Sequence, residues 1–266
     1  MLLSVQDLSV EIGRTQIINK ASFTLQAGET VALLGPNGAG KSTLVQAIAG
    51  IQKPSGGAVH LDVGGIGGLA YLPQDGIGRT GLTVVEAILL GRYDQLGLTV
   101  SSAEIRQARD ALARFGIDHL ASRTVESLSG GQRQLAGLAQ VFFRQPRVML
   151  LDEPTSALDL YRQLIVLDEL QRIAAERKIG VLAILHDLSL ATRFADRILF
   201  LKDGALVADD RTEAVMTSPM LRQIYNIDAE ILRTRTDAIQ VAALAAIGPH
   251  HEEGRTQPEP SDDICS

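Results

Sequence analysis

Cysteine is almost absent from this sequence of 266 residues, which has a single one, Cys265, next to its last position. One thiol forms no internal disulfide, so the composition does not suggest an oxidising compartment. Long apolar runs are absent too, since no stretch approaches the about 18 residues of a membrane-spanning helix. The first residues have no basic segment before an apolar run and do not match a signal peptide. We therefore expect a soluble, cytoplasmic chain whose role at any membrane depends on a partner.

The sequence also lacks an excess of positive charge. Its 25 Lys and Arg residues are outnumbered by 31 Asp and Glu residues, which gives a formal net charge of -6. A protein that binds nucleic acid by neutralising phosphates needs the opposite balance, so nucleic acid is not expected as a partner. Hydrophobic residues make up 45% of the chain, which is enough for one sizeable α/β domain with a large core.

Hydrophobic patterns divide the chain into strands and helices. Up to residue 34, apolar and polar residues alternate in short bursts, which predicts antiparallel strands with one solvated face. Continuous apolar bursts predict buried strands at 30–34, 69–72, 148–151, 181–185 and 198–201, and a further strand is expected at 59–61. Helical spacing predicts helices at 41–49, 84–90, 103–115 and 133–143, and one that contains Leu160, Leu164, Leu167 and Leu170.

The order of these elements predicts the architecture. Strands that alternate with helices favour a parallel sheet with right-handed crossovers, and helical periods dominate from about 76 to 140. We expect an α/β fold whose core comprises residues 1–75 and 141–248, interrupted by a helical subdomain over about 76–140. Residues 238–247 fit either a strand or a short helix. The polar segment 249–266, which contains three prolines, is expected to be a disordered tail.

A glycine-rich segment, GPNGAGKST, lies between the strand expected at 30–34 and the helix expected at 41–49, and it fits the P-loop pattern. Glycines let successive backbone N–H groups curl around a phosphate, and the helix N-terminus adds partial positive charge. Lys41 would reach the β- and γ-phosphates, and the Ser42 hydroxyl would ligate Mg²⁺. The alternative is a glycine turn that only joins a strand to a helix. The residues of the segment are Gly35, Pro36, Asn37, Gly38, Ala39, Gly40, Lys41, Ser42 and Thr43.

Two acids, Asp152 and Glu153, follow the apolar strand expected at 148–151. In a parallel sheet the carboxyl ends of the strands share one edge, so these acids would lie beside the P-loop. Asp152 would hold Mg²⁺, directly or through water, and Glu153 would orient and deprotonate the attacking water as a general base. Without the P-loop, the same pair fits the start of a loop or a helix cap equally well.

The segment LSGGQ at 128–132 opens the helix expected at 133–143. Ser129 is typical of an N-cap, and Gly130 and Gly131 leave backbone N–H groups open to an anion. An ordinary capped helix start would have the same appearance, so the segment predicts an anion site only in combination with the P-loop.

Together these residues resemble the ABC ATPase family, for which LSGGQ is the signature sequence. Three further segments match the family's pattern in order and spacing between about residues 1 and 235. Gln74 in YLPQ resembles the Q-loop, SALD at 156–159 resembles the D-loop, and His186 in ILHD resembles the switch histidine. Without this resemblance, His186 would be interpreted as a structural histidine at the end of a strand.

The resemblance implies a fold and a set of functional residues. The fold would be a P-loop NTPase with a RecA-like parallel core, an antiparallel β subdomain and an inserted ABC-type helical subdomain, binding ATP and Mg²⁺. Catalytic roles are implied for Lys41, Glu153 and His186, and metal contacts for Ser42, Gln74 and Asp152. Nucleotide contacts are implied for the P-loop residues 35–43 and for Gln74, Ser129, Gly130, Gly131, Gln132 and Asp159.

Partners are implied by the same resemblance. Cassettes of this family pair head to tail, so that each ATP lies between the P-loop of one and the signature of the other. This chain has one of each, which implies a homodimer or a paired cassette. With no membrane span and no second cassette, the chain is expected to be the ATPase subunit of an importer. It would bind integral membrane permease subunits at the cytoplasmic face of the inner membrane and serve a substrate-binding protein indirectly.

The segment GRYDQLG at 91–97 resembles the GRxPHxG stretch of iron-chelate, haem and cobalamin importer ATPases, with Asp94 and Gln95 in place of Pro-His. The segment LHDLSLATRFADRILFLKDGALVADD is also close to that group. The expected cargo is therefore an iron(III)-siderophore, haem or cobalamin. The alternatives are importers of manganese, zinc or phosphonate, a lipid export cassette, and a soluble ABC protein without a transport role.

Two places depart from the family's pattern. Leu135 and the stretch LAQVF stand where an arginine and an IARAL-like stretch are common. Ile12 stands where an aromatic residue commonly stacks on adenine, and the nearby residues offer no replacement ring. We expect phosphate binding without base stacking at Ile12. The alternative is that Ile12 is a buried strand residue and that another ring stacks on the base.

Overall fold

The structure is a computed structural model that describes residues 1–62, 68–95, 100–235 and 238–247. The polar tail expected at 249–266 lies outside the described residues, as do residues 96 and 97 of the GRYDQLG segment. Among the helices in the described ranges, none combines the length and the apolar character that a membrane crossing requires.

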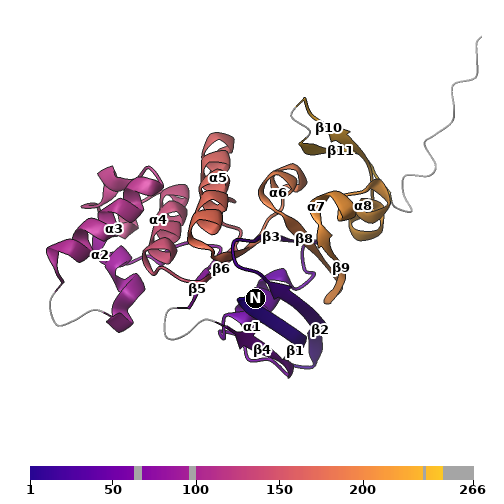
Figure 1. Cartoon of the computed structure of the whole chain (residues 1–266), viewed down its shortest axis with the longest axis horizontal. Coiled ribbons are helices and arrows are strands. Elements are labelled where there is room, and N and C mark those ends of the chain that lie inside the picture. The colour runs from indigo at the N-terminus through magenta and orange to yellow at the C-terminus, as the bar shows by residue number, and fades with distance from the viewer. Residues whose placement is uncertain (63–67, 96–99, 236–237, 248–266) are drawn as a thin grey trace, which may run out of the picture.

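A six-stranded sheet forms the centre of the molecule (Figure 1). Its strand order is β5-β6-β7-β3-β8-β9, and every neighbouring pair is parallel except β8 and β9. The strands are β3 (Thr30–Leu34), β5 (Leu69–Leu72), β6 (Val148–Asp152), β7 (Gly180–Ile184), β8 (Arg197–Lys202) and β9 (Ala205–Arg211). The predicted α/β fold with a parallel core is therefore confirmed.

The antiparallel edge strand β9 was not predicted, although the sequence contains a signal for it. Asp203 and Gly204 connect β8 to β9, and both have left-handed backbones, with φ of 49° and 77°. A two-residue hairpin of the kind that matches strand twist needs positive φ at both positions, and Asp-Gly is among the preferred pairs. This tight turn reverses the chain where a helical crossover would have kept the strands parallel.

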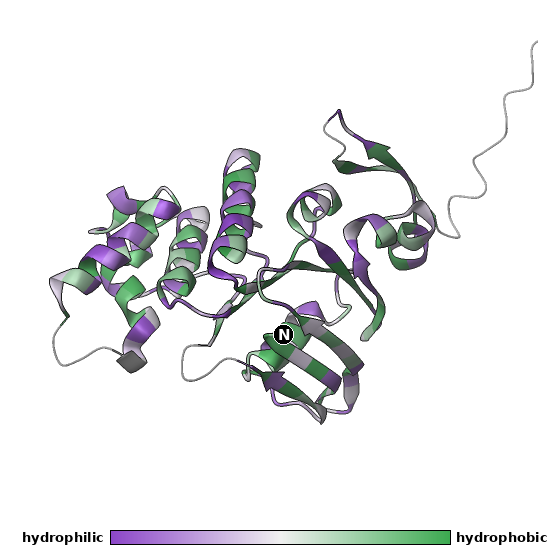
Figure 2. Cartoon of the chain, in the orientation of Figure 1, coloured by the Kyte–Doolittle hydropathy of each residue, from purple (hydrophilic) through white to green (hydrophobic). Residues whose placement is uncertain are grey.

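The two faces of the central sheet are buried in two separate hydrophobic cores. In β3, Val31 and Leu33 belong to one core and Ala32 and Leu34 to the other, because successive residues of a strand point to opposite faces. The elements that cover the first face are α1 (Lys41–Ile48) and the antiparallel strands β1 (Leu3–Ile12), β2 (Thr15–Leu25) and β4 (Gly56–Leu61). On the second face lie α5 (Leu160–Arg177) and α6 (Leu188–Phe194). Figure 2 shows hydrophobic and hydrophilic residues alternating around α5, one side of which packs on the sheet.

A group of helices lies between β5 and β6 in the chain and projects from one end of the sheet (Figure 1). Its elements are α2 (Val84–Leu89), η1 (Leu90–Gln95), α3 (Ser102–Arg114), η2 (Asp118–Leu120), η3 (Val125–Ser127) and α4 (Gly130–Phe143). The three α-helices begin with capping boxes, in which a hydroxyl and an acid or amide three residues later each bond the other's backbone N–H. These caps explain why the helices begin where they do.

The last described residues form α7 (Thr212–Val215), α8 (Ser218–Tyr225) and a hairpin of β10 (Ile227–Arg233) and β11 (Ile239–Ala246). The ambiguous segment 238–247 is therefore largely a strand. Residues of β11 pack against α6, so the hairpin extends the layer on the second face of the sheet (Figure 1).

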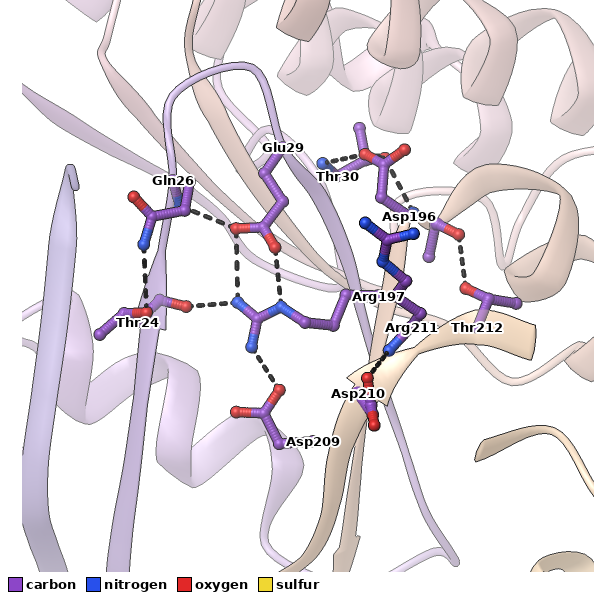
Figure 3. A network of polar contacts seen from close by, with 11 residues as sticks. Thr24, Gln26, Glu29, Thr30, Asp196, Arg197, Asp209, Asp210, Arg211 and Thr212 are labelled. Atoms are coloured by element: carbon purple, nitrogen blue, oxygen red, sulfur yellow. Dashed lines mark hydrogen bonds and ion pairs between the residues drawn. The ribbon is translucent and has the colours of Figure 1, made fainter. Parts of the chain in front are cut away.

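One ion-pair network joins the antiparallel sheet to the central sheet (Figure 3). The largely buried Arg197 guanidinium, at the start of β8, donates to Glu29 Oε1 at 2.7 Å and to the Thr24 carbonyl oxygen at 2.5 Å. It also pairs with Asp209 on β9. Beside it, Asp196 accepts hydrogen bonds from the backbone and the hydroxyl of Thr30. The network fixes the loop that enters β3, and β3 leads directly into the glycine-rich segment.

Candidate active site

The glycine-rich loop connects the end of β3 to the start of α1, as the sequence predicted. Residues 35–40 form the loop, and Lys41, Ser42 and Thr43 form the first turn of the helix. Gly40 is the helix N-cap with φ of 100°, and a β-carbon there would lie 2.8 Å from Ile18 Cδ1. Only glycine satisfies both the left-handed backbone and the lack of space. The helix N-terminus therefore opens onto the loop without an obstructing side chain, which suits a phosphate group.

The ammonium group of Lys41 lies inside this loop. Its Nζ donates to the carbonyl oxygens of Gly35 at 2.7 Å and Pro36 at 2.9 Å. Burial lowers the pKa of Lys41, and the nearby carboxylates of Glu153 and Asp152 oppose that shift. The structure thus holds a buried cation inside the P-loop, where its positive charge would attract a phosphate group bound by the loop.

Ser42 and Asp152 meet at the carboxyl ends of β3 and β6, as predicted. The Ser42 hydroxyl donates to Asp152 Oδ1 at 3.0 Å, and the Tyr71 hydroxyl donates to Asp152 Oδ2 at 3.3 Å. Burial raises the pKa of Asp152, although these hydrogen bonds and Lys41 favour its ionised form. A hydroxyl and one carboxylate are hard oxygen ligands of the kind that hold Mg²⁺ together with substrate phosphates, so the residues present fit this ion.

Glu153 has a rare backbone conformation, and each oxygen of its carboxylate contacts another side chain. Its φ of 50° is left-handed, which is rare for a residue with a β-carbon. Gln74 Nε2 donates to one carboxylate oxygen at 2.8 Å, and His186 Nε2 lies 2.5 Å from the other. Glu153 and His186 also line a cavity of about 260 Å³. The structure therefore brings together three predicted residues from the ends of β5, β6 and β7, and the cavity gives the Glu153 carboxylate space for a water molecule.

Gln134 was not predicted, yet it organises the backbone around Glu153. This buried side chain of α4 donates to the Glu153 carbonyl oxygen at 2.5 Å and accepts from the backbone N–H of Ala157 at 2.9 Å. The sequence contained a signal for it, because positions 134, 138 and 141 share one helix face. A polar residue at a core-facing position must find a hydrogen-bond partner.

Tyr225 of α8 also contacts the P-loop, and the sequence analysis did not predict this contact. Burial raises the pKa of Tyr225 to about 12, and a hydrogen bond from the backbone of Gly35 opposes that shift. Its ring packs edge to face on Phe200, with the ring centroids 6.3 Å apart. Helix α8 therefore supports the start of the P-loop.

The signature residues lie in a different part of the site. Ser129 caps α4, and its backbone N–H is bonded by the side chain of Gln132. A β-carbon on Gly131 would lie 2.7 Å from the carbonyl oxygen of Ala157, whereas Gly130 has more room. Asp159 caps α5 by accepting from the backbone N–H of Arg162 at 2.9 Å. In the described ranges no hydrogen bond links these signature residues to the P-loop of the same chain.

Ile12 is an exposed residue at the end of β1, with 52% of its surface accessible. The alternative that Ile12 is a buried strand residue is therefore wrong. Its side chain is free to contact a nucleotide base, but it has no ring to stack on one.

These elements define a class of protein. A P-loop whose lysine faces two acids at the same edge of the sheet, with hydroxyl and carboxylate ligands for Mg²⁺, is the site of a P-loop nucleoside triphosphatase. Comparison with known proteins narrows this class. Residues 18–156 match the family model described as ABC transporter. The chain belongs to the ABC transporter family, as an ATP-binding and ATP-hydrolysing cassette.

Similar proteins support this assignment over nearly the whole chain. The hemin import ATP-binding protein HmuV of Bordetella avium is 36% identical over 248 residues, which cover 87% of this chain and 95% of that protein. The iron(3+)-hydroxamate import ATP-binding protein FhuC of Bacillus subtilis is 35% identical over 241 residues, covering 86% and 90%. A solved structure described as a metal-chelate type ABC transporter in an inward-facing conformation has a TM-score of 0.80 at 28% identity. It covers 92% of this chain and 98% of its own.

Proposed function

We propose that this chain powers the import of a metal chelate, with an iron(III)-siderophore, haem or cobalamin as the cargo. The names of its relatives support this proposal, because proteins that match along nearly their full length are named for the import of hemin and of iron(3+)-hydroxamate. The GRYDQLG and LHDLSLA segments support it as well. Of these three cargo classes, the relatives' names favour hemin and siderophores.

One observation supports ATP hydrolysis most directly. Gln74 and His186 each contact one oxygen of the Glu153 carboxylate. A general base must present an oxygen to water in a fixed direction, and two partners on the two oxygens fix that direction. Glu153 would accept the proton of the attacking water. Lys41 and the P-loop amides would stabilise negative charge that grows on the phosphates. From its position beside this carboxylate, His186 would contact the γ-phosphate.

Ser42, Gln74 and Asp152 are proposed to hold Mg²⁺. When bound, this ion would neutralise the charge of the β- and γ-phosphates. Gln74 lies at the end of β5, where the chain leaves the central sheet for the inserted helices. A residue at this junction is suited to transmit the state of the nucleotide to those helices.

The assembly is also part of the proposal. Each chain would contribute its P-loop to one ATP and Ser129, Gly130, Gly131, Gln132 and Asp159 to the other, in a homodimer or with a paired cassette. Two such chains would bind integral permease subunits at the cytoplasmic face of the inner membrane. Within each chain, we propose a core of residues 1–75 and 141–248 and a helical subdomain of about 76–140.

An uptake assay tests the cargo. Cells that lack this chain are expected to lose uptake of a labelled ferric siderophore, haem or cobalamin, and the intact gene should restore it. A Glu153→Gln gene should not restore it. A defect confined to free Mn²⁺ or Zn²⁺ would contradict the chelate assignment, and normal uptake of all of these would contradict the importer assignment.

A further inference from the structure

The C-terminal hairpin β10–β11 carries none of the predicted site residues and lies outside the segment that the family model matches. It nevertheless packs on α6, the helix that begins two residues after His186 (Figure 1). Asp187 is the N-cap of α6 and accepts a hydrogen bond from the backbone N–H of Leu190 at 2.8 Å. His186 is therefore joined to the first turn of α6 by a single capping residue.

Helix α6 is short, and its two ends are held by different elements. It spans seven residues, which is too few for an isolated helix to be stable. Its last turn is held by α5, where Gln171 Nε2 donates to the carbonyl oxygen of Phe194 at 2.8 Å and Arg193 pairs with Asp168. These contacts fix the end of the helix that is farther from His186.

The first turn and the middle of α6 are held by β11. The backbone N–H of Val241 donates to Ser189 Oγ at 3.1 Å. The one hydrogen of the Thr192 hydroxyl is shared between two carbonyl oxygens at 2.8 Å, that of Ile239 on β11 and that of Ser189 one turn earlier in α6. Ile239 is itself buried in the same core as the apolar face of α6. The hairpin thus holds α6, whose first turn follows His186 by one capping residue, through two hydroxyl groups.

We propose that Ser189 and Thr192, through the β10–β11 hairpin, position His186 against Glu153 for ATP hydrolysis. The distance of 2.5 Å between His186 Nε2 and Glu153 Oε1 leaves little tolerance for a shift of the first turn. Small misplacements of a catalytic group lower the rate of the chemical step more than the affinity for substrate. Ser189 and Thr192 are positioning residues, since neither lies among the groups proposed to touch the nucleotide. The inference rests on the proposed roles of Glu153 and His186.

Variants of the full-length chain that lack one hydroxyl test this proposal. Thr192→Val keeps the shape of the side chain, and Ser189→Ala removes the second contact at little change in volume. We expect each variant to lower kcat about three- to tenfold, the effect of one net hydrogen bond, with KM and Kd for ATP within about twofold of the wild type. Thr192→Ser keeps the hydroxyl and should restore kcat. Ser55→Ala removes an exposed hydroxyl that is distant in sequence from α6 and β11, and it serves as the control.

Two measurements separate positioning from a general loss of folded protein. Rates are taken per bound nucleotide at a temperature well below the melting point of every variant, and KM for ATP is measured beside kcat in Thr192→Val and Ser189→Ala. Wild-type kcat in both variants, together with slow hydrolysis by His186→Ala, would overturn this inference alone. A loss in KM rather than kcat would overturn it as well. Wild-type rates in His186→Ala would instead overturn the proposed catalytic assignment.

Discussion

At the scale of single residues, Glu153 has a strained backbone conformation that contacts with other residues maintain. A left-handed backbone is less stable by about 1–2 kcal/mol for a residue with a β-carbon. Contacts on three sides maintain it, since Gln134 bonds its carbonyl oxygen and Gln74 and His186 contact its carboxylate. Backbone strain of this kind concentrates at functional sites, where the surrounding structure holds a side chain in one direction.

Lys41 is expected to determine affinity for the nucleotide. Lys41→Ala removes a buried cation that the P-loop carbonyls hold in place, so ATP binding should weaken by about 10- to 100-fold. Calorimetric titration of ATP measures this change. Lys53→Ala, which removes an exposed lysine, is the control and should bind ATP normally. Equal affinities for the wild type and Lys41→Ala would exclude a phosphate contact for this lysine.

Ile12 is expected to limit recognition of the base. A stacked aromatic ring contributes about 1–3 kcal/mol per base in nucleic-acid systems, and an isoleucine offers dispersion without stacking. The wild type should therefore hydrolyse GTP nearly as well as ATP, and Ile12→Tyr should bind ATP several-fold more tightly at unchanged turnover. Titration of both nucleotides against Ile12→Tyr and the control Ile51→Tyr, another exposed site, measures this. A sharp preference of the wild type for ATP, with no gain from tyrosine, would show that other groups hold the base.

At the scale of elements, the antiparallel sheet and the central sheet are joined by charges as well as by apolar packing. Arg197 on β8 contacts the loop before β3 and the neighbouring strand β9 at once (Figure 3). Because that loop precedes the strand that leads into the P-loop, the network links the stability of the fold to the position of the site.

Removing the Arg197 charge should destabilise the fold measurably. Arg197→Met leaves the largely buried Glu29 and the more exposed Asp209 without their partner, a loss of about 3 kcal/mol at the low end for buried pairs. Arg172→Met breaks the pairs of an exposed guanidinium on α5 and should destabilise the fold much less. Urea unfolding of both variants gives the comparison. Similar losses for the two would mean that the Arg197 network contributes no more than a surface pair.

At the scale of the whole molecule, the cassette is proposed to be half of a functional unit. The P-loop and the signature lie on different elements, and the described contacts of Gly131 are with the D-loop residues Ala157 and Leu158. We propose that a complete nucleotide site with both parts needs a second copy or a paired cassette.

Glu153→Gln should reveal this pairing. Without its general base the variant should still bind ATP but hydrolyse it at least about 100-fold more slowly. It should therefore accumulate as a dimer in the presence of ATP, which size-exclusion chromatography with light scattering detects. Lys41→Ala should stay monomeric under the same conditions because it binds ATP weakly. A hydrolysis rate of Glu153→Gln near that of the wild type would exclude Glu153 as the base.

Local sequence signals were sufficient for much of the fold and for part of the site. Apolar bursts predicted β3, β6 and β7, because a strand buried on both faces needs apolar residues throughout. The spacing of Gly35, Gly40 and Lys41 predicted the P-loop, since its glycines meet backbone constraints within a few residues. The sequence by itself thus determined the parallel core and the presence of a nucleotide-binding loop.

Only the tertiary structure decided which distant groups meet. Gln74 and His186 are 79 and 33 residues from Glu153, and Ser42 is 110 residues from Asp152. Their contacts depend on the strand order of the sheet, which places the ends of β3, β5, β6 and β7 along one edge. The hydrogen bonds of Gln134 and those between β11 and α6 could not be predicted either. A hydrogen bond between distant segments produces no periodic pattern in the sequence. Such contacts exist only once the chain has folded, and they determine the directions in which the reactive side chains point.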